Sequence, residues 1–205
     1  MRSVSIIDYG MGNIYSISNA VRNLGWEAKV IHTPADLASS DKAILPGVGA
    51  YRDAMKVLNG MGLCRALVEH ARSGKPLLGI CLGMQLLLES SEENGGVDGL
   101  GIVGGAVRRF SSDSGYKIPQ IQWNAVSWRS EMAMFDDIAD DSMFYFLHSY
   151  YCLPAADGLI GAHSNYAGSD YCSAFQHNNI WATQFHPEKS SRAGLQLLSN
   201  FLTQE

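Results

Sequence analysis

The pattern of hydrophobic and polar positions changes half-way along the chain. In the first half, short apolar runs alternate with segments whose apolar residues recur every three or four positions, which predicts buried strands separated by amphipathic helices. The predicted strands are residues 4–8, 28–31, 43–45 and 77–80, and the predicted helices are 14–24 and 51–73, the latter with a break near 60–62. Strands that are connected through helices lie parallel in one sheet.

In the second half, apolar runs follow one another closely, with little helical periodicity between them. They predict strands at residues 103–110, 124–127, 143–152, 159–166, 171–176 and 180–185, a polar loop at 111–115 and a final helix at 191–202. Short connections are typical of antiparallel pairing. We therefore expect one α/β domain over residues 1–205, with a mainly parallel central sheet flanked by helices and extended by antiparallel strands in the C-terminal half.

One cysteine lies where a predicted strand meets a predicted helix. Residues 76–89 read Pro-Leu-Leu-Gly-Ile-Cys-Leu-Gly-Met-Gln-Leu-Leu-Leu-Glu, so that Gly79 and Gly83 flank Cys81 in a tight turn. A thiol above a helix N-terminus is favoured as the thiolate. The backbone N–H of Leu82 would then face an oxyanion, as in the nucleophile elbow of serine hydrolases. A buried structural cysteine in a strand-to-helix turn is the alternative interpretation.

A histidine and a carboxylate follow the last predicted strand. Residues 184–190 read Gln-Phe-His-Pro-Glu-Lys-Ser, and in an extended segment the side chains of His186 and Glu188 point the same way. The carboxylate would orient the imidazole and stabilise its protonated form, so that His186 can act as general base and then as general acid. With Cys81 these residues form a nucleophile, a base and an orienting acid, the set that acyl transfer requires.

These motifs resemble those of a known enzyme family. Gly-Ile-Cys-Leu-Gly-Met-Gln at 79–85 together with Gln-Phe-His-Pro-Glu at 184–188 is similar to the signature of the class I (triad) glutamine amidotransferases. The resemblance covers nearly the whole chain. Within the family, the motifs are most similar to those of the glutaminase subunits of imidazole glycerol phosphate synthases. This resemblance is carried further by Ile-Asp-Tyr-Gly-Met-Gly-Asn at 7–13, Leu-Pro-Gly-Val-Gly-Ala at 45–50, Trp-Asn at 123–124 and Tyr-Phe-Leu-His-Ser-Tyr at 145–150.

The resemblance implies an activity and assigns roles to individual residues. The activity is hydrolysis of glutamine to glutamate and ammonia through Cys81, His186 and Glu188, in histidine biosynthesis and without a cofactor. Oxyanion donors are expected at Leu82, Val48 and Gly49, and glutamine-binding groups at Gly47, Gln85, Ser149 and Tyr150. His148 is a second candidate base, but only His186 has an adjacent carboxylate.

The resemblance also implies a partner, a (β/α)8-barrel synthase subunit that receives the ammonia in a heterodimer. Interface residues are expected at Asn13, Trp123, Tyr145 and Lys189. Three departures from the usual motifs concern this surface and not the triad, namely Gln120, Gln122 and the pair Val103-Gly104. They keep one alternative open, a paralogue that supplies ammonia for sugar amidation in surface-polysaccharide synthesis. A second alternative, independent of these departures, is a stand-alone γ-glutamyl hydrolase.

Composition restricts the remaining possibilities. The formal net charge is −5, and no stripe of Lys and Arg with interleaved aromatic residues is present, which argues against a nucleic-acid partner. The four cysteines have neither metal-ligand spacing nor a disulfide pattern, so we expect free thiols, no metal and a reducing cytoplasm. Two glycine patterns, at residues 10–15 and 99–104, lack the context of a nucleotide site and are predicted to be turns. No apolar run is long enough to span a bilayer, so no membrane association is expected.

Overall fold

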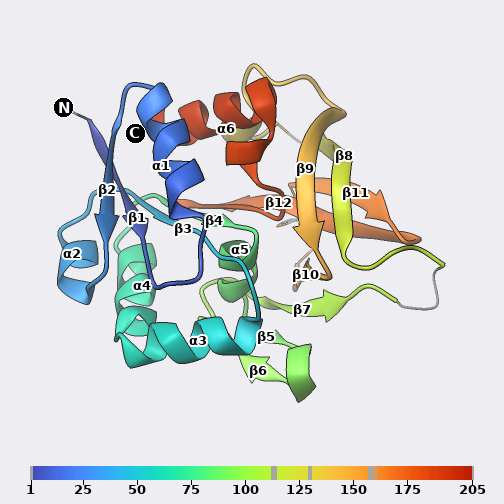
Figure 1. The fold of residues 1–205 in the computed structure, drawn as a ribbon, viewed down its shortest axis with the longest axis horizontal. Coiled ribbons are helices and arrows are strands. Elements are labelled where there is room, and N and C mark those ends of the chain that lie inside the picture. Colours follow the sequence, from blue (N-terminus) through green and yellow to red (C-terminus); the bar gives the residue numbers. More distant parts are fainter. Residues whose placement is uncertain (1, 112–114, 129–130, 157–158, 160, 205) are drawn as a thin grey trace.

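A parallel sheet forms the centre of the computed structural model, which describes residues 2–111, 115–128, 131–156, 159 and 161–204 (Figure 1). Its five strands lie in the order β2-β1-β3-β4-β13, and each pairs in parallel with its neighbours. They are β1 (Ser3–Ile7), β2 (Glu27–Ile31), β3 (Ala43–Leu45), β4 (Leu77–Ile80) and β13 (Ile180–Thr183). Because both faces of this sheet are covered, β3, β4 and β13 are buried at every position and their sequences are continuous apolar runs.

Helices cover the two faces of the parallel sheet and divide the core into two apolar clusters (Figure 1). On one face, α1 (Ile14–Asn23) and α6 (Ser191–Thr203) pack against side chains such as Ile6 and Leu78. On the other face, the adjacent strand residues Ile7 and Leu77 pack against the remaining helices. These are α2 (Pro34–Ala38), α3 (Tyr51–Gly60), α4 (Leu63–Arg72) and α5 (Leu82–Leu86).

Antiparallel strands extend the sheet beyond β13. The order continues with β12 (Ser169–His177), β10 (Tyr150–Pro154), β7 (Gly105–Arg109), β5 (Ser90–Ser91) and β6 (Val97–Asp98), with only β5 and β7 parallel. A second layer follows from β12 through β11 (Ala162–Tyr166) and β8 (Gln120–Trp128) to β9 (Ser142–His148). Within the described residues, 3-10 turns lie at Glu93–Gly95, Ala133–Phe135 and Pro187–Lys189.

The predicted fold class is confirmed, and the deviations are local. The expected strand at residues 143–152 is two strands that separate at Ser149, and the expected strand at 124–127 begins earlier, at Gln120. The short helix α2 and the β5–β6 hairpin were not predicted, because their few residues carry little periodicity. Of the predicted loop at 111–115, residues 112–114 lie outside the described residues.

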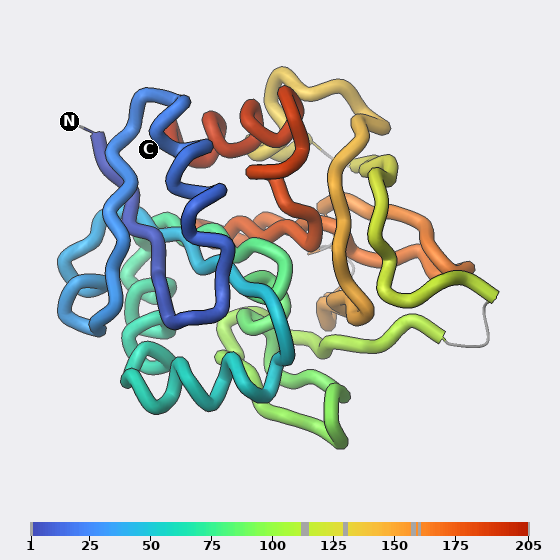
Figure 2. Tube along the Cα trace, viewed as in Figure 1, coloured from blue at the N-terminus to red at the C-terminus, as the bar shows by residue number. Residues whose placement is uncertain are grey.

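The end of the chain returns to its beginning, as the red segments beside the blue ones show (Figure 2). The sequence alone suggested that residues 180–185 belong to the antiparallel half; β13 does pair antiparallel with β12, but on its other side it pairs in parallel with β4. The chain therefore places the end of its last strand beside the end of a strand that lies about a hundred residues earlier. Among the described residues no helix is both long and apolar enough to cross a membrane.

Candidate active site

Cys81 occupies a strained turn between β4 and α5. Its backbone has φ +54° and ψ −109°, an uncommon conformation for a residue with a side chain and one that marks functional turns. The turn also requires Gly83, since a Cβ at that position would overlap the carbonyl oxygen of Leu45. The predicted elbow is therefore present, although its helix is only five residues long.

Parallel pairing of β4 and β13 brings the second motif to the cysteine. Thr183 pairs with Ile80, and the Cys81 N–H donates to the Thr183 carbonyl over 2.7 Å. The residues that follow both strands therefore emerge at the same edge of the sheet, where α/β proteins commonly bind ligands.

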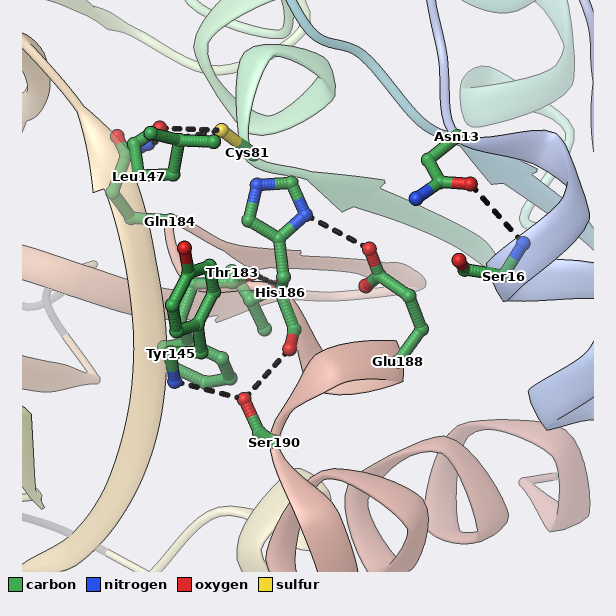
Figure 3. A network of polar contacts seen from close by, with 11 residues as sticks. Asn13, Ser16, Cys81, Tyr145, Leu147, Thr183, Gln184, His186, Glu188 and Ser190 are labelled. Atoms are coloured by element: carbon green, nitrogen blue, oxygen red, sulfur yellow. Dashed lines mark hydrogen bonds and ion pairs between the residues drawn. The ribbon is translucent and has the colours of Figure 1, made fainter. Parts of the chain in front are cut away.

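His186 lies between Cys81 and Glu188 (Figure 3). Its Nδ1 is 2.9 Å from Oε1 of Glu188, and the exposed fractions of the two side chains are 2% and 1%. A carboxylate oxygen can only accept, so Nδ1 carries a proton and donates it in this hydrogen bond. The other nitrogen, Nε2, is buried without a hydrogen-bond partner and lies on the side of the ring that faces Cys81. The predicted nucleophile, base and orienting acid are thus brought together.

The surroundings of His186 favour its protonated form. Burial opposes the positive charge, but the negative charge of Cys81 and the hydrogen-bonded carboxylate of Glu188 outweigh burial and raise the pKa of His186 to about 10. A protonated imidazole at this position can deliver a proton to a departing amine.

His148, the other candidate base, is in the opposite situation. It is buried, with 6% of its surface exposed, and the centroid of its ring lies 5.3 to 5.6 Å from those of Phe110, Phe146 and Tyr171. Burial lowers the pKa of His148 to about 3, and the hydrogen bond from its Nδ1 to the Tyr150 carbonyl only partly compensates. His148 is therefore a neutral packed residue with no carboxylate partner.

A pocket of about 310 Å³ opens beside Cys81. Residues that were expected to bind substrate or stabilise an oxyanion line it, namely Val48, Gly49, Leu82, Gln85, Ser149 and Tyr150. Gly47, also expected to bind substrate, is not among the lining residues, and a Cβ there would lie 2.7 Å from the Tyr9 hydroxyl and 2.8 Å from Cβ of Leu82. Among the described residues, no group of three or more His, Cys, Asp or Glu side chains could hold a metal ion.

The loop at residues 46–49 was expected to supply oxyanion donors, and its Val48 N–H is turned away from the pocket in this structure. The N–H of Val48 donates to the Met11 carbonyl over 3.0 Å, so this group does not face the pocket in the present conformation. Gly49, next in the chain, has φ +107°. Val48 could serve as an oxyanion donor only after its peptide group had turned away from Met11.

Comparison with known proteins agrees with this geometry. The family model described as "Glutamine amidotransferase class-I" matches residues 5–204, nearly the entire chain. The chain belongs to the class-I glutamine amidotransferases. Solved structures support the same fold at low identity. "Structure of PurLQS from Thermotoga maritima" has a TM-score of 0.77 and 17% identity, covering 98% of each chain. "Crystal structure of glutamine amidotransferase" has a TM-score of 0.75 and 18% identity, covering 97% of each chain.

More similar relatives of this amidotransferase are named as imidazole glycerol phosphate synthase proteins. "Imidazole glycerol phosphate synthase subunit HisH" of Chlorobium luteolum is 51% identical over 97% of this chain and 98% of that protein. The protein of the same name from Acinetobacter baylyi is 47% identical over 98% of both. "Imidazole glycerol phosphate synthase hisHF, chloroplastic" of Arabidopsis thaliana is 44% identical over 97% of this chain but only 34% of that protein.

Three of the four predicted interface residues of the amidotransferase lie together. Trp123 on β8 is 42% exposed and pairs with Tyr145 on β9, with the ring centroids 6.2 Å apart. Nζ of Lys189 lies 5.8 Å from the centre of the Tyr145 ring. Asn13 has a separate structural task, because its side chain accepts from the Ser16 N–H and caps α1 (Figure 3).

Sequence reasoning missed several residues at this site. Glu93 lines the pocket and accepts from the Tyr51 N–H, but it comes from the 3-10 turn of the unpredicted β5–β6 hairpin. Tyr9 donates to the Pro46 carbonyl, and burial and the negative charge of Cys81 raise the pKa of Tyr9. Gln184 donates to Sγ of Cys81 over 3.7 Å. Tyr9 and Gln184 belong to motifs that were recognised, so their position in those motifs was the available signal.

Proposed function

We propose that the chain is the glutaminase subunit of an imidazole glycerol phosphate synthase and passes ammonia to a barrel synthase subunit in the cytoplasm. The observation that carries the chemistry is the imidazole of His186, which is held by Glu188 on one side and faces Cys81 on the other. Relatives that are 47% and 51% identical over nearly their whole length bear the name of this synthase subunit, which supports the assignment of the pathway.

The proposed reaction proceeds through a covalent thioester. The Cys81 thiolate attacks the side-chain amide carbon of glutamine, and His186 protonates the nitrogen as the carbon–nitrogen bond breaks and ammonia leaves. Water then attacks the γ-glutamyl thioester with His186 as base, releasing glutamate and restoring the thiol. Glu188 keeps the imidazole in the tautomer and orientation that both steps need.

The oxyanion of each step requires two donors, and we propose that the loop at residues 46–49 supplies the second. The Leu82 N–H, at the start of α5, is the first. The second is the Val48 N–H, after the peptide group between Gly47 and Val48 has rotated away from the Met11 carbonyl, or the N–H of Gly49. A peptide next to glycine can rotate with little steric hindrance. One such donor is worth about 10²–10³ in rate, so this rotation would switch the glutaminase on.

Glutamine would bind in the pocket beside Cys81 with its amino-acid end toward Gln85 and Glu93. Both N–H groups of the Gln85 amide are engaged by the protein, with the Tyr150 carbonyl and with Oε1 of Gln184. Its oxygen is therefore the atom left for a ligand, and an oxygen that accepts suits the α-ammonium group of glutamine. Glu93 adds a negative charge to the same pocket.

The partner would dock on the outward face of β8 and β9. Ile121, Trp123 and Met143 are exposed there by 51%, 42% and 49%, an unusual gathering of large apolar side chains. This face is tied directly to the triad, because the Tyr145 carbonyl accepts from the His186 N–H over 2.9 Å. In the plant relative named hisHF, the matching segment is joined to a longer remainder of the same chain, which fits a permanent association.

The test is glutamate release from glutamine by the pure chain, alone and with a histidine-pathway barrel synthase that is loaded with its nucleotide substrate. We expect low activity alone and strong stimulation by the loaded barrel. A Trp123→Ala variant should lose stimulation but keep the activity of the isolated chain. High activity without any partner would instead identify a stand-alone hydrolase, and activity that the loaded barrel leaves unchanged would contradict the proposed partner.

A further inference from the structure

A continuous path of side-chain hydrogen bonds connects the pocket to the sulfur of Cys81. Gln85 Nε2 donates to the Tyr150 carbonyl over 2.9 Å and to Oε1 of Gln184 over 3.1 Å. Gln184 Nε2 in turn donates to Sγ of Cys81 over 3.7 Å (Figure 3). Gln184 is completely buried, and Gln85 is 5% exposed, so these contacts are shielded from water.

The direction of this path is fixed by its first acceptor. A backbone carbonyl can only accept, so the Gln85 amide must turn its nitrogen toward Tyr150, and that nitrogen then also faces Gln184. Gln184 must therefore accept this hydrogen bond with its oxygen, so that its own N–H groups lie on the side of the sulfur. The amide orientation at the Cys81 sulfur is thus determined by the Gln85 side chain, whose hydrogen bonds go to Tyr150 and Gln184.

We propose that Gln184 is a positioning residue of the glutaminase reaction: it fixes the side chain of Cys81 and stabilises the thiolate by donating a hydrogen bond to it. The inference rests on the proposed role of Cys81 as nucleophile. The neighbouring Leu147 carbonyl, 3.8 Å from Sγ, accepts from the thiol and disfavours the thiolate. Gln184 counteracts this carbonyl with an N–H donor, and donors to an ionised partner form the stronger kind of hydrogen bond.

The same path connects the nucleophile with pocket occupancy. Gln85 lines the pocket, and a cation at its free oxygen would polarise the amide and strengthen its N–H as a donor. Gln184 then receives a stronger hydrogen bond at its oxygen and becomes a better donor to the sulfur. Binding of the substrate's ammonium group thereby favours the thiolate at the moment when it is needed.

The experiment is alkylation of Cys81 by iodoacetamide as a function of pH, without glutamine or partner and with the modified peptide identified by mass spectrometry. Gln184→Met keeps the approximate volume but removes the donor. We expect alkylation at pH 7 to be slower by about tenfold and the midpoint of the pH profile to move upward by about one pH unit. In turnover, kcat should fall while KM changes little.

Two further variants separate the loss of the hydrogen bond to Cys81 from a change in side-chain packing. Gln176→Met removes a half-buried glutamine opposite Trp181, at the other end of β13, and should keep the wild-type alkylation profile. Gln85→Glu does not alter any group that touches the sulfur, but its carboxylate can only accept. Gln184 would then turn its N–H toward position 85 and its oxygen toward Cys81, so the profile should move in the same direction as in Gln184→Met.

The proposal is overturned if Gln184→Met or Gln85→Glu, folded by circular dichroism, alkylates with the wild-type pH profile. Because alkylation requires no glutamine turnover, this outcome is distinct from a failure of the proposed function. A chain without glutaminase activity could still show the shifted profile, and an active chain could still lack it.

Discussion

Two buried histidines lie near Cys81, and their surroundings shift their pKa values in opposite directions, so that one is protonated and the other neutral. His186 faces the cysteine and a carboxylate, which together raise its pKa to about 10 against the effect of burial. His148 lies among aromatic rings, and burial lowers its pKa to about 3. Both side chains are hidden from water, so burial alone does not determine the protonation state; the presence of an anionic partner does. Of the two histidines, only the one beside a carboxylate and the cysteine is held in the form that can donate a proton.

The largest effect should come from Cys81→Ala, which removes the nucleophile and the negative charge beside His186. Glutamine hydrolysis should fall to the background level, measured as glutamate release in the presence of the stimulating barrel. The pKa of His186, followed by NMR titration of the ring protons, should fall because its largest favourable influence is gone. Retained turnover would contradict the assignment of the nucleophile, and an unchanged titration would remove Cys81 from the explanation of the His186 charge.

Glu188→Gln should have the next largest effect. The amide can still occupy the site, but it carries no charge and does not hold the imidazole in a single tautomer, so kcat should fall by about 10²–10⁴-fold. The pKa of His186 should fall as well, because Glu188 contributes both a hydrogen bond and a charge. The matched control is Glu69→Gln on the exposed side of α4, which should leave turnover unchanged. If both variants behave alike, Glu188 does not orient the base.

His148→Phe should make the free energy of unfolding depend less on pH below pH 7. Below pH 6.5 the unfolded chain takes up a proton at this histidine, whereas the folded protein does not until the pH approaches 3, so His148 lowers stability as the pH falls. At pH 5 this loss amounts to roughly 2 kcal/mol. Urea unfolding of the variant should therefore show a decline between pH 7 and pH 5 that is smaller by about that amount. The exposed His177, replaced by Gln, should keep the wild-type slope.

The smallest effect is expected for His148→Phe in catalysis. The variant fills the aromatic surroundings and loses one hydrogen bond to the Tyr150 carbonyl, which retains its bond from Gln85. One such neutral hydrogen bond corresponds to a change in kcat/KM of at most about tenfold. A loss of 10²-fold or more in glutamate release would mean that His148 takes part in proton transfer and that the comparison has assigned the base wrongly.

Where the predictions from sequence succeeded, they rested on local features. Residues 43–45 and 77–80 were predicted as strands with their observed bounds, because completely buried parallel strands leave continuous apolar runs. The elbow at Cys81 and the pair of His186 and Glu188 were also predictable, since each depends on residues within a few positions of one another. The roles of these residues remain a proposal that the experiments above test.

Other features of the site could not be predicted from local patterns. The Val48 N–H was expected at the oxyanion, but a carbonyl from a distant turn, that of Met11, binds it. Glu93 was not predicted as a pocket residue, because its hairpin is too short to show periodicity. Asn13 caps α1, a role that was not predicted for it, and its place at the interface remains a prediction.

Local sequence specifies which groups the chain carries and the short-range geometry around them: a cysteine in a tight strand-to-helix turn, and a histidine with a carboxylate two residues later. These groups meet because the fold pairs β4 in parallel with β13. The tertiary structure also sets the protonation state of each histidine, and it turns the nitrogen of the Gln184 amide, not the oxygen, toward the sulfur. The physical reason is that hydrogen bonds and charges act over a few ångströms of space, whereas the partners here, such as Gln184 with Gln85 and with Cys81, lie 99 and 103 positions apart in the chain.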